Sequence, residues 1–337
     1  MRQAVYALCA TLAITLMAAL AARFGGSNLA LVAVPYIALA VFLSGFCYRV
    51  GRWAASPVPF RIPTTCGQQK SLPWIKHAKL ENPASLPGVL GRMGLEILLF
   101  RSLFRNTGAG IHEKRLVFAE QKYLWLGALV FHWSLLVILL RHLRLFIDPV
   151  PGFVIAVGRL DGFFQVGTPE LYLSDILFTC ALAYLAVRRF REPLVRYISQ
   201  FSDYFAVLLL LGIGVSGLLM RHITRVDVVA VKQFALGLAS FHPVLPNTLG
   251  VMFVVHVVLV STLAVYFPFS KLMHIGGVFL SPTRNLANNN RAKRHVNPWD
   301  YPVKTHSYAE WEEEFRDKLK GADIPLEADH AGRATAD

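Results

Sequence analysis

The sequence has few charged residues and no cysteine motif. Only 16% of its 337 residues are charged, whereas a soluble globular domain carries about 25%. The four cysteines form neither a C-x-x-C pair nor a C-x-x-C-H motif, which argues against covalently attached haem, iron–sulfur ligation or a zinc ribbon in this chain. A Walker A loop, a dinucleotide fingerprint and internal repeats are also missing. These absences disfavour an ordinary α/β enzyme and a disulfide-stapled secreted domain.

Long apolar runs are present instead. Hydrophobic residues make up 55% of the chain, and its mean hydropathy is +0.46. Crossing a bilayer core takes about 20 apolar residues of helix. Six runs meet this length: 4–22, 30–48, 123–147, 171–187, 204–220 and 248–268. The fold class we predict is therefore an all-α membrane protein with six transmembrane helices, and the first run is too long for a typical signal peptide.

Positive charge is unevenly placed around these runs. The net charge is +13, and 27 of the 34 Lys and Arg residues fall at the N-terminus, in 49–122, in 188–203 or after residue 268. Because Lys and Arg accumulate on the cytoplasmic side, both termini are expected in the cytoplasm. Charges that flank apolar runs indicate a membrane surface, and no nucleic-acid partner is expected.

The long basic loop 49–122 contains one apolar segment. Met93 to Arg105 is predicted to form a helix with an apolar face. Two roles are compatible with it: an interfacial helix lying on lipid headgroups, and a docking surface for a cytoplasmic partner.

The C-terminal tail also contains a predicted helix. Ser307 and Glu310 form a capping-box pattern, and Gly321 is a typical stop. Trp311 and Phe315 share one face, which indicates a subunit contact. The alternative is a mobile, partly helical tail, because an isolated helix of this length is marginal in water.

Four of the eleven histidines lie in apolar segments. His132 and His142 belong to the third run, while His256 and His274 belong to the sixth run and its extension. A haem iron with two axial imidazoles needs two such side chains. Two histidines on each of two spans therefore predict two b-type haems. One haem, or four hydrogen-bonded packing histidines, are the alternatives.

Topology pairs these histidines. The third and sixth runs are antiparallel, so His142 is level with His256 on the outer side, and His132 with His274 on the inner side. The unequal spacings require tilt or a kink, for which Pro268 is a suitable place.

Other polar residues compete for roles near these pairs. Arg141 and Arg144 suit haem propionates, or alternatively extend to lipid headgroups; Lys271 is the inner counterpart. His222 and His242 are interfacial histidines, with proton exchange or outer ligation as the functional alternatives.

These spacings resemble a known family. The two histidine pairs and the run from Pro268 to His274 are similar to the dihaem b gamma chain of respiratory nitrate reductase, over roughly 120–280. The same core occurs in the membrane subunit of heterodisulfide reductase. The extra N-terminal spans, the basic loop, and the runs 281–285 and 297–299 resemble the DsrM family of membrane cytochromes b in dissimilatory sulfur metabolism.

The resemblance implies a function. His142 and His256 would bind an outer haem, and His132 and His274 an inner haem, in the inner membrane of a prokaryotic cell. Electrons would pass between menaquinone and a cytoplasmic DsrK-like iron–sulfur subunit, with further membrane and periplasmic subunits. The chain would be an oxidoreductase only as part of that complex. Its expected divisions are 1–48 (two helices), 49–122 (basic loop), 123–276 (dihaem four-helix core) and 277–337 (tail with docking helix).

Two other functions are compatible with the sequence. One is a haem-free anchor or transporter subunit with packing or proton-relay histidines. The other is the cytochrome b of a different quinone-linked oxidoreductase, such as nitrate reductase, hydrogenase or formate dehydrogenase.

Overall fold

The computed structural model describes residues 2–56, 67–113, 115–162, 169–281, 285–291, 302 and 304–327. The chain divides into two units. The first comprises residues 1–56 and 61–293, and the second comprises 57–60 and 294–337. The first unit contains all four histidines singled out above. The runs 282–284 and 297–299, the prolines at 57, 59 and 63, and Cys66 lie outside the described residues.

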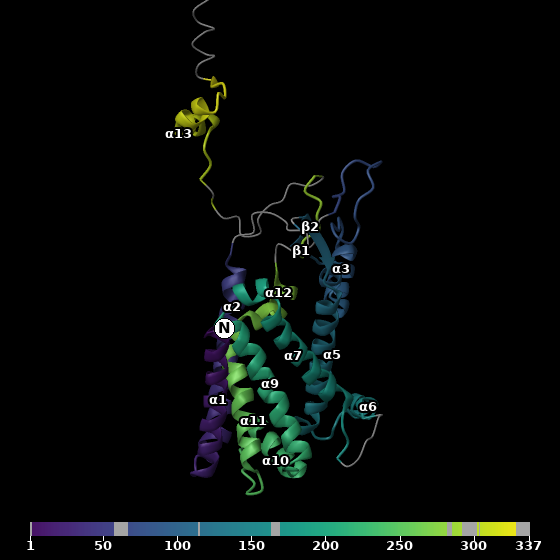
Figure 1. The fold of residues 1–337 in the computed structure, drawn as a ribbon, viewed down its shortest axis with the longest axis vertical. Helices are drawn as coiled ribbons and strands as arrows, with labels where there is room; N and C mark the ends of the chain where they lie inside the picture. Colours follow the sequence, from purple (N-terminus) through teal and green to yellow (C-terminus); the bar gives the residue numbers. More distant parts are fainter. Residues whose placement is uncertain are drawn as a thin grey trace, which may run out of the picture. The chain divides into compact units, whose positions relative to one another are not determined.

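Five helices of the described chain are long and apolar enough to cross a membrane (Figure 1). They are α1 (Arg2–Arg23), the π-helical turn η1 (Leu29–Ala33) continued by α2 (Val34–Ala54), α5 (Lys122–Phe146), α9 (Phe201–His222), and α11 (Val251–Tyr266) continued by the 3₁₀ turn η2 (Phe267–Phe269). Their apolar length makes the chain a multi-pass membrane protein. These helices confirm five of the six predicted runs.

The remaining run, 171–187, forms helix α7 (Leu173–Arg191) but does not meet the same criterion. Charge is the physical reason: Asp175 lies in its first turn, and Arg188, Arg189 and Arg191 lie in its last. Such residues are costly in hydrocarbon unless they have partners. Helix α7 nevertheless packs closely on α5, where a Cβ on Gly127 would lie 2.6 Å from the Tyr184 ring. A side chain at position 127 would therefore force the Tyr184 ring to move.

The largest buried cluster joins α1, α9 and α11. Its fully buried members include Ala7, Leu209 and Leu259, each at most 1% exposed. Small alanines on α1 allow the helix to lie close to its neighbours, because membrane helices associate through close packing rather than through a hydrophobic driving force. This cluster fixes α11, which carries His256, against α9.

Short helices occupy both ends of the first unit (Figure 1). At one end lie α6 (Gly152–Asp161) and α10 (Val228–Ala239), the latter capped by the Asp227 carboxylate accepting from the Val229 amide at 2.9 Å. At the other end lie α12 (His274–Leu280), the short α8 (Pro193–Ile198) and the described residues between 67 and α5. The sequence analysis did not predict α6 or α10.

The helix predicted over 93–105 is corrected by the structure. Helix α3 begins earlier and spans Leu86–Leu99, Phe100 adopts a left-handed conformation (φ 49°), and the four-residue α4 spans Arg101–Phe104. The Trp133 and Trp125 indole N–H groups donate to the Leu98 and Leu99 carbonyls at 3.0 and 2.7 Å. These bonds satisfy the open carbonyl end of α3 and hold it against α5.

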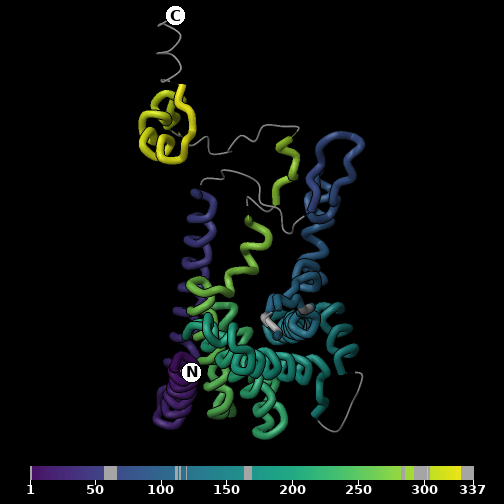
Figure 2. Tube along the Cα trace, turned by 45° about the horizontal axis from the view of Figure 1, so that its top comes forward, coloured from purple at the N-terminus to yellow at the C-terminus, as the bar shows by residue number. Residues whose placement is uncertain are grey.

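A hairpin that was not predicted follows α4. Strand β1 (Thr107–His112) pairs antiparallel with β2 (Arg115–Glu120), with Ala109 opposite Phe118. Figure 2 follows this segment, in blue, to its connection with α5.

Buried asparagines connect the start of this segment to the chain after α12. The Asn288 amide N–H donates to the Pro83 carbonyl at 2.6 Å, and Asn288 Nδ2 donates to Asn82 Oδ1 at 2.7 Å. Glu81 forms an ion pair with Arg101 at 2.5 Å. The chain that precedes α3 is therefore hydrogen-bonded to the chain that follows α12.

The second unit contains α13 (Tyr308–Gly321) and is described by itself. Its predicted capping box is confirmed: the Glu310 amide donates to Ser307 Oγ at 3.3 Å, and the Ser307 amide donates to the Glu310 carboxylate at 2.8 Å. Trp311 and Phe315 have ring centroids 5.6 Å apart, as expected for one face.

Candidate haem and quinol sites

The structure brings His132 and His274 together. Their ring centroids are 5.9 Å apart with an interplanar angle of 81°. A metal–imidazole bond is about 2 Å long, so two imidazoles on opposite sides of one metal have ring centroids about 6 Å apart. The Phe100 ring packs edge-on against His132, with a centroid distance of 4.9 Å. Phe100 lies at the left-handed break between α3 and α4, and this backbone conformation places its ring beside His132.

His274 reaches this position because α11 is interrupted. The helix ends at Tyr266, and the chain continues through η2, around Pro268, and the second 3₁₀ turn η3 (Lys271–Met273) before α12 begins at His274. The expected break at Pro268 is confirmed. Lys271 donates to Asp203 at 2.8 Å while its side chain stays 74% exposed.

The second pair, His142 and His256, lies toward the other end of the bundle. The two rings are close enough to interact electrostatically. Ten residues separate His142 from His132 on α5, which is about 15 Å along the helix axis. The structure therefore brings the His132 and His274 rings into contact and places His142 and His256 near enough for their charges to interact.

All four imidazoles have an oxygen partner at Nδ1. His132 bonds the Ala128 carbonyl at 2.8 Å, His142 the Ile138 carbonyl at 2.7 Å and His274 the Lys271 carbonyl at 2.9 Å. His256 Nδ1 lies 2.9 Å from Ser216 Oγ. A carbonyl can only accept, so in His132, His142 and His274 Nδ1 carries the proton and Nε2 keeps its lone pair. This is the tautomer that ligates a metal through Nε2, and the donor set fits haem iron.

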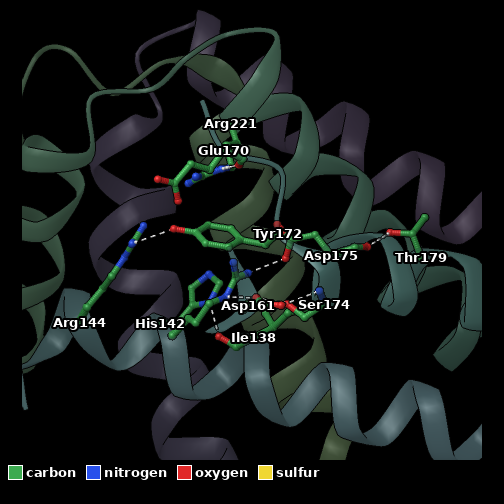
Figure 3. Close-up of polar contacts among 11 residues, drawn as sticks. Ile138, His142, Arg144, Asp161, Glu170, Tyr172, Ser174, Asp175, Thr179 and Arg221 are labelled. Atoms are coloured by element: carbon green, nitrogen blue, oxygen red, sulfur yellow. Dashed lines mark hydrogen bonds and ion pairs between the residues drawn. The ribbon is translucent and has the colours of Figure 1, made fainter. Parts of the chain in front are cut away.

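A buried ionic cluster adjoins His142 (Figure 3). The Arg141 guanidinium pairs with Asp161 at 3.0 Å and Asp175 at 2.5 Å, and its side chain is 8% exposed. It also lies over the Tyr172 ring, 3.6 Å from the centroid, as does Arg221 at 4.3 Å. Asp161 additionally accepts from the Ser174 amide at 2.8 Å and the Ser174 hydroxyl at 2.6 Å. The cluster joins α5, α6, α7 and α9 around the outer pair.

Arg141 and Arg144 differ in what remains open to a ligand. Arg141 is engaged by two aspartates, yet its Nη1 is buried without a hydrogen-bond partner among the described residues. Arg144 has one long bond to the Tyr172 hydroxyl, at 3.5 Å. A buried donor without a partner is costly, and a carboxylate beside His142 would satisfy it. Both arginines thus fit the propionate role proposed from the sequence.

Arg141 and Arg144 also line a cavity of about 420 Å³ between α5 and α6. One wall is apolar and includes Val150, Val154 and Ile155, with Gly158 and Gly162 beside them. The other wall is polar and includes Arg159, Glu170 and Tyr172. An apolar cleft with a few convergent polar groups is typical of a site for a small organic molecule.

The two competing histidines lie outside both pairs. His222 is the last residue of α9, and its buried Nε2 has no partner among the described residues. His242 is exposed in the loop after α10 and bonds the Ser240 carbonyl at 2.8 Å.

Several residues of the site were not identified from the sequence. Phe100 was expected inside a helix, and Ser216 lies in an apolar stretch of α9. Asp161 is the last residue of α6, whereas Tyr172 and Asp175 lie at the start of α7. Asp175 alone gave a signal, since it is an acidic residue inside an expected span.

Four histidines in a bundle of long apolar helices belong here to a multi-pass membrane protein. The chain belongs to the nitrate reductase gamma subunit family, whose match covers residues 103–291 and includes all four histidines. It is 47% identical over 276 residues to the Hdr-like menaquinol oxidoreductase cytochrome b-like subunit of Archaeoglobus fulgidus, covering 80% of this chain and 82% of that relative. The protein of the same description from Archaeoglobus profundus is 44% identical over 275 residues, with the same coverage.

Proposed function

We propose that this protein is the membrane subunit of a menaquinol-linked electron-transfer complex and holds two b-type haems. The observation that carries the proposal is the set of four histidines His132, His142, His256 and His274. In each of them Nδ1 is hydrogen-bonded and Nε2 is left for a metal. The relatives named as cytochrome b-like subunits of Hdr-like menaquinol oxidoreductases support it. We further propose the DsrM role, in dissimilatory sulfur metabolism.

The chain's residues have distinct tasks in this proposal. His132 and His274 hold the inner haem, and His142 and His256 hold the outer one. The buried Nη1 of Arg141 and the Arg144 side chain pair with the outer propionates. When bound, the haems supply one-electron redox chemistry with no open coordination position. The apolar helices beside each pair would give the haems surroundings of low dielectric constant.

Menaquinol would bind in the cavity between α5 and α6. The apolar wall at Val154 and Ile155 suits the naphthoquinone ring, and the polar wall offers Glu170 and Tyr172 to the hydroxyl groups. Oxidation of one menaquinol to menaquinone releases two electrons and two protons. The electrons would pass to the adjacent outer haem. The two protons would leave the cavity past Glu170, which lies in its polar wall.

The remaining assignments concern orientation and partners. We propose that α7 is the sixth span, its charges paired within the protein, and that both termini are cytoplasmic. A DsrK-like iron–sulfur subunit would then meet the end of the bundle that holds His132 and His274. The divisions 1–48, 49–122, 123–276 and 277–337 would correspond to anchor, loop, dihaem core and docking tail, alongside further membrane and periplasmic subunits.

The direct test is the haem content of the purified chain. We expect a b-type band in the reduced-minus-oxidised spectrum and two haems per chain by pyridine haemochrome assay. A chain with all four histidines and no b-type band would be a haem-free anchor or transporter, and the proposal would be wrong. Purification with a hydrogenase or formate dehydrogenase instead of an iron–sulfur heterodisulfide-reductase-like subunit would reject the DsrM role alone.

The cavity has its own test. A Cβ at Gly158 meets no atom within 4 Å, so Gly158→Phe places a ring at the cavity without backbone strain. We expect menaquinol-dependent electron transfer in the intact complex to fall by about tenfold or more, with both haem bands unchanged. Gly152→Phe is the matched control, because Gly152 is equally open but does not line the cavity. Equal rates in the two variants would move the quinol site elsewhere.

A further inference from the structure

His256 differs from the other three histidines in what holds its ring. Each of the others bonds a backbone carbonyl three or four residues earlier in its own chain segment. The partners of His256 lie on a different helix, α9: they are the Ser216 side chain and the Ile213 carbonyl. Ser216 is 4% exposed, so water does not compete for this bond. One of the four proposed ligands is therefore oriented by a neighbouring helix.

The direction of the bond follows from the second contact of Ser216. Its Oγ lies 2.9 Å from the Ile213 carbonyl and 2.9 Å from His256 Nδ1. A hydroxyl has one proton, and a carbonyl can only accept, so that proton points at Ile213. The oxygen is then an acceptor toward His256. His256 must donate from Nδ1, which leaves Nε2 as the nitrogen with a free lone pair.

Gly217, the residue after Ser216, also lies against the His256 ring. A Cβ at Gly217 would lie 3.5 Å from His256 Cε1, so the α9 backbone lies against the imidazole at this turn. The ring is thus held in plane by the serine and along one edge by the helix. Both contacts come from α9, and the buried cluster of α1, α9 and α11 fixes that helix against α11.

We propose that Ser216 is a positioning residue for the outer haem, acting through His256. The inference rests on the proposed function and deepens it. An acceptor at Nδ1–H makes an imidazole a more basic ligand. A more basic ligand favours the oxidised iron, so Ser216 lowers the midpoint potential of the outer haem. The inner haem, whose histidines use backbone carbonyls, is unaffected.

The test compares two side chains of the same shape at position 216. Ser216→Thr keeps the hydroxyl, and Ser216→Val removes it; Ser216→Ala removes it without adding volume. Both haem midpoints are measured by redox titration of the intact complex, together with the electron paramagnetic resonance signals of the oxidised haems. The midpoint that disappears in His142→Ala identifies the outer site. We expect Val and Ala to raise that midpoint alone, and Thr to stay near the wild type.

The control is Thr262→Val on α11, whose hydroxyl bonds only the Val258 carbonyl of its own helix. It should leave both midpoints unchanged. Two haems with unaltered midpoints in Ser216→Val and Ser216→Ala would overturn the inference and leave the proposed function standing. A shift at the inner haem, or an equal shift in Thr262→Val, would also overturn it. Wild-type protein without haem would instead remove the proposed function itself.

Discussion

Replacement of His142 by alanine is expected to remove the outer haem and leave the inner one in place. His142 shares its site with His256 and not with His274, so His256→Ala should give the same product. His132→Ala and His274→Ala should each lose the inner haem, because the centroids of those two rings lie 5.9 Å apart. Haem per chain should fall from two to one in each variant, and one of two midpoints should vanish.

Matched controls separate ligation from general damage. His242→Ala changes an exposed loop histidine and should retain both haems. His222→Ala tests the nearest competitor for the outer site, since its Nε2 is buried without a partner among the described residues. Loss of the same haem from His142→Ala and His274→Ala would refute the pairing. Loss of the outer haem from His222→Ala, with retention in His256→Ala, would transfer that ligand role to His222.

Arg141→Ala is the second change with a large expected effect. It would leave Asp161 and Asp175 buried without their shared cation, and removing one partner of a buried ion pair costs about 3–5 kcal/mol. We expect the unfolding free energy in detergent to fall by that order. Helix α6 should detach from α5 as well, because the Arg141 pair with Asp161 joins them.

Two further variants show whether charge is the cause. In Arg141→Met with Asp161→Asn and Asp175→Asn, the buried carboxylates are neutral, so much of the lost stability should return. Lys232→Ala breaks an exposed pair with Asp148 at 3.0 Å, at the same end of the molecule, and should cost about 1 kcal/mol or less. Equal losses from Arg141→Ala and Lys232→Ala would contradict the buried-pair account.

The spans were predictable because their signal is local. About 20 consecutive apolar residues identify a membrane helix whatever it packs on, and the proline break before His274 is local too. The hairpin was missed because β1 carries two glycines, Gly108 and Gly110, which weaken any strand pattern. Helices α6 and α10 were missed because apolar runs of 10 and 12 residues are short beside the spans.

The proximity of His132 and His274 was predictable for a different reason. Antiparallel topology indicates which histidine lies level with which, without side-chain detail. Ser216 could not be found this way, because α9 and α11 are apolar all round and no periodicity shows which faces meet. The partners of Arg141 were equally hidden, since Asp161 and Asp175 reach it from two other helices. Such contacts are products of tertiary packing.

The two sites also differ in when they can be completed. A ribosome delivers the N-terminal part of a chain first. Each proposed site would take one ligand from α5 and one from the segment containing α11 and α12, so neither could form until nearly the last span has been made. The proposed outer site would be complete once His256 has emerged, and the inner site would wait for His274. Cofactor loading would therefore come late in synthesis, and a chain truncated between these two histidines would carry only its outer site.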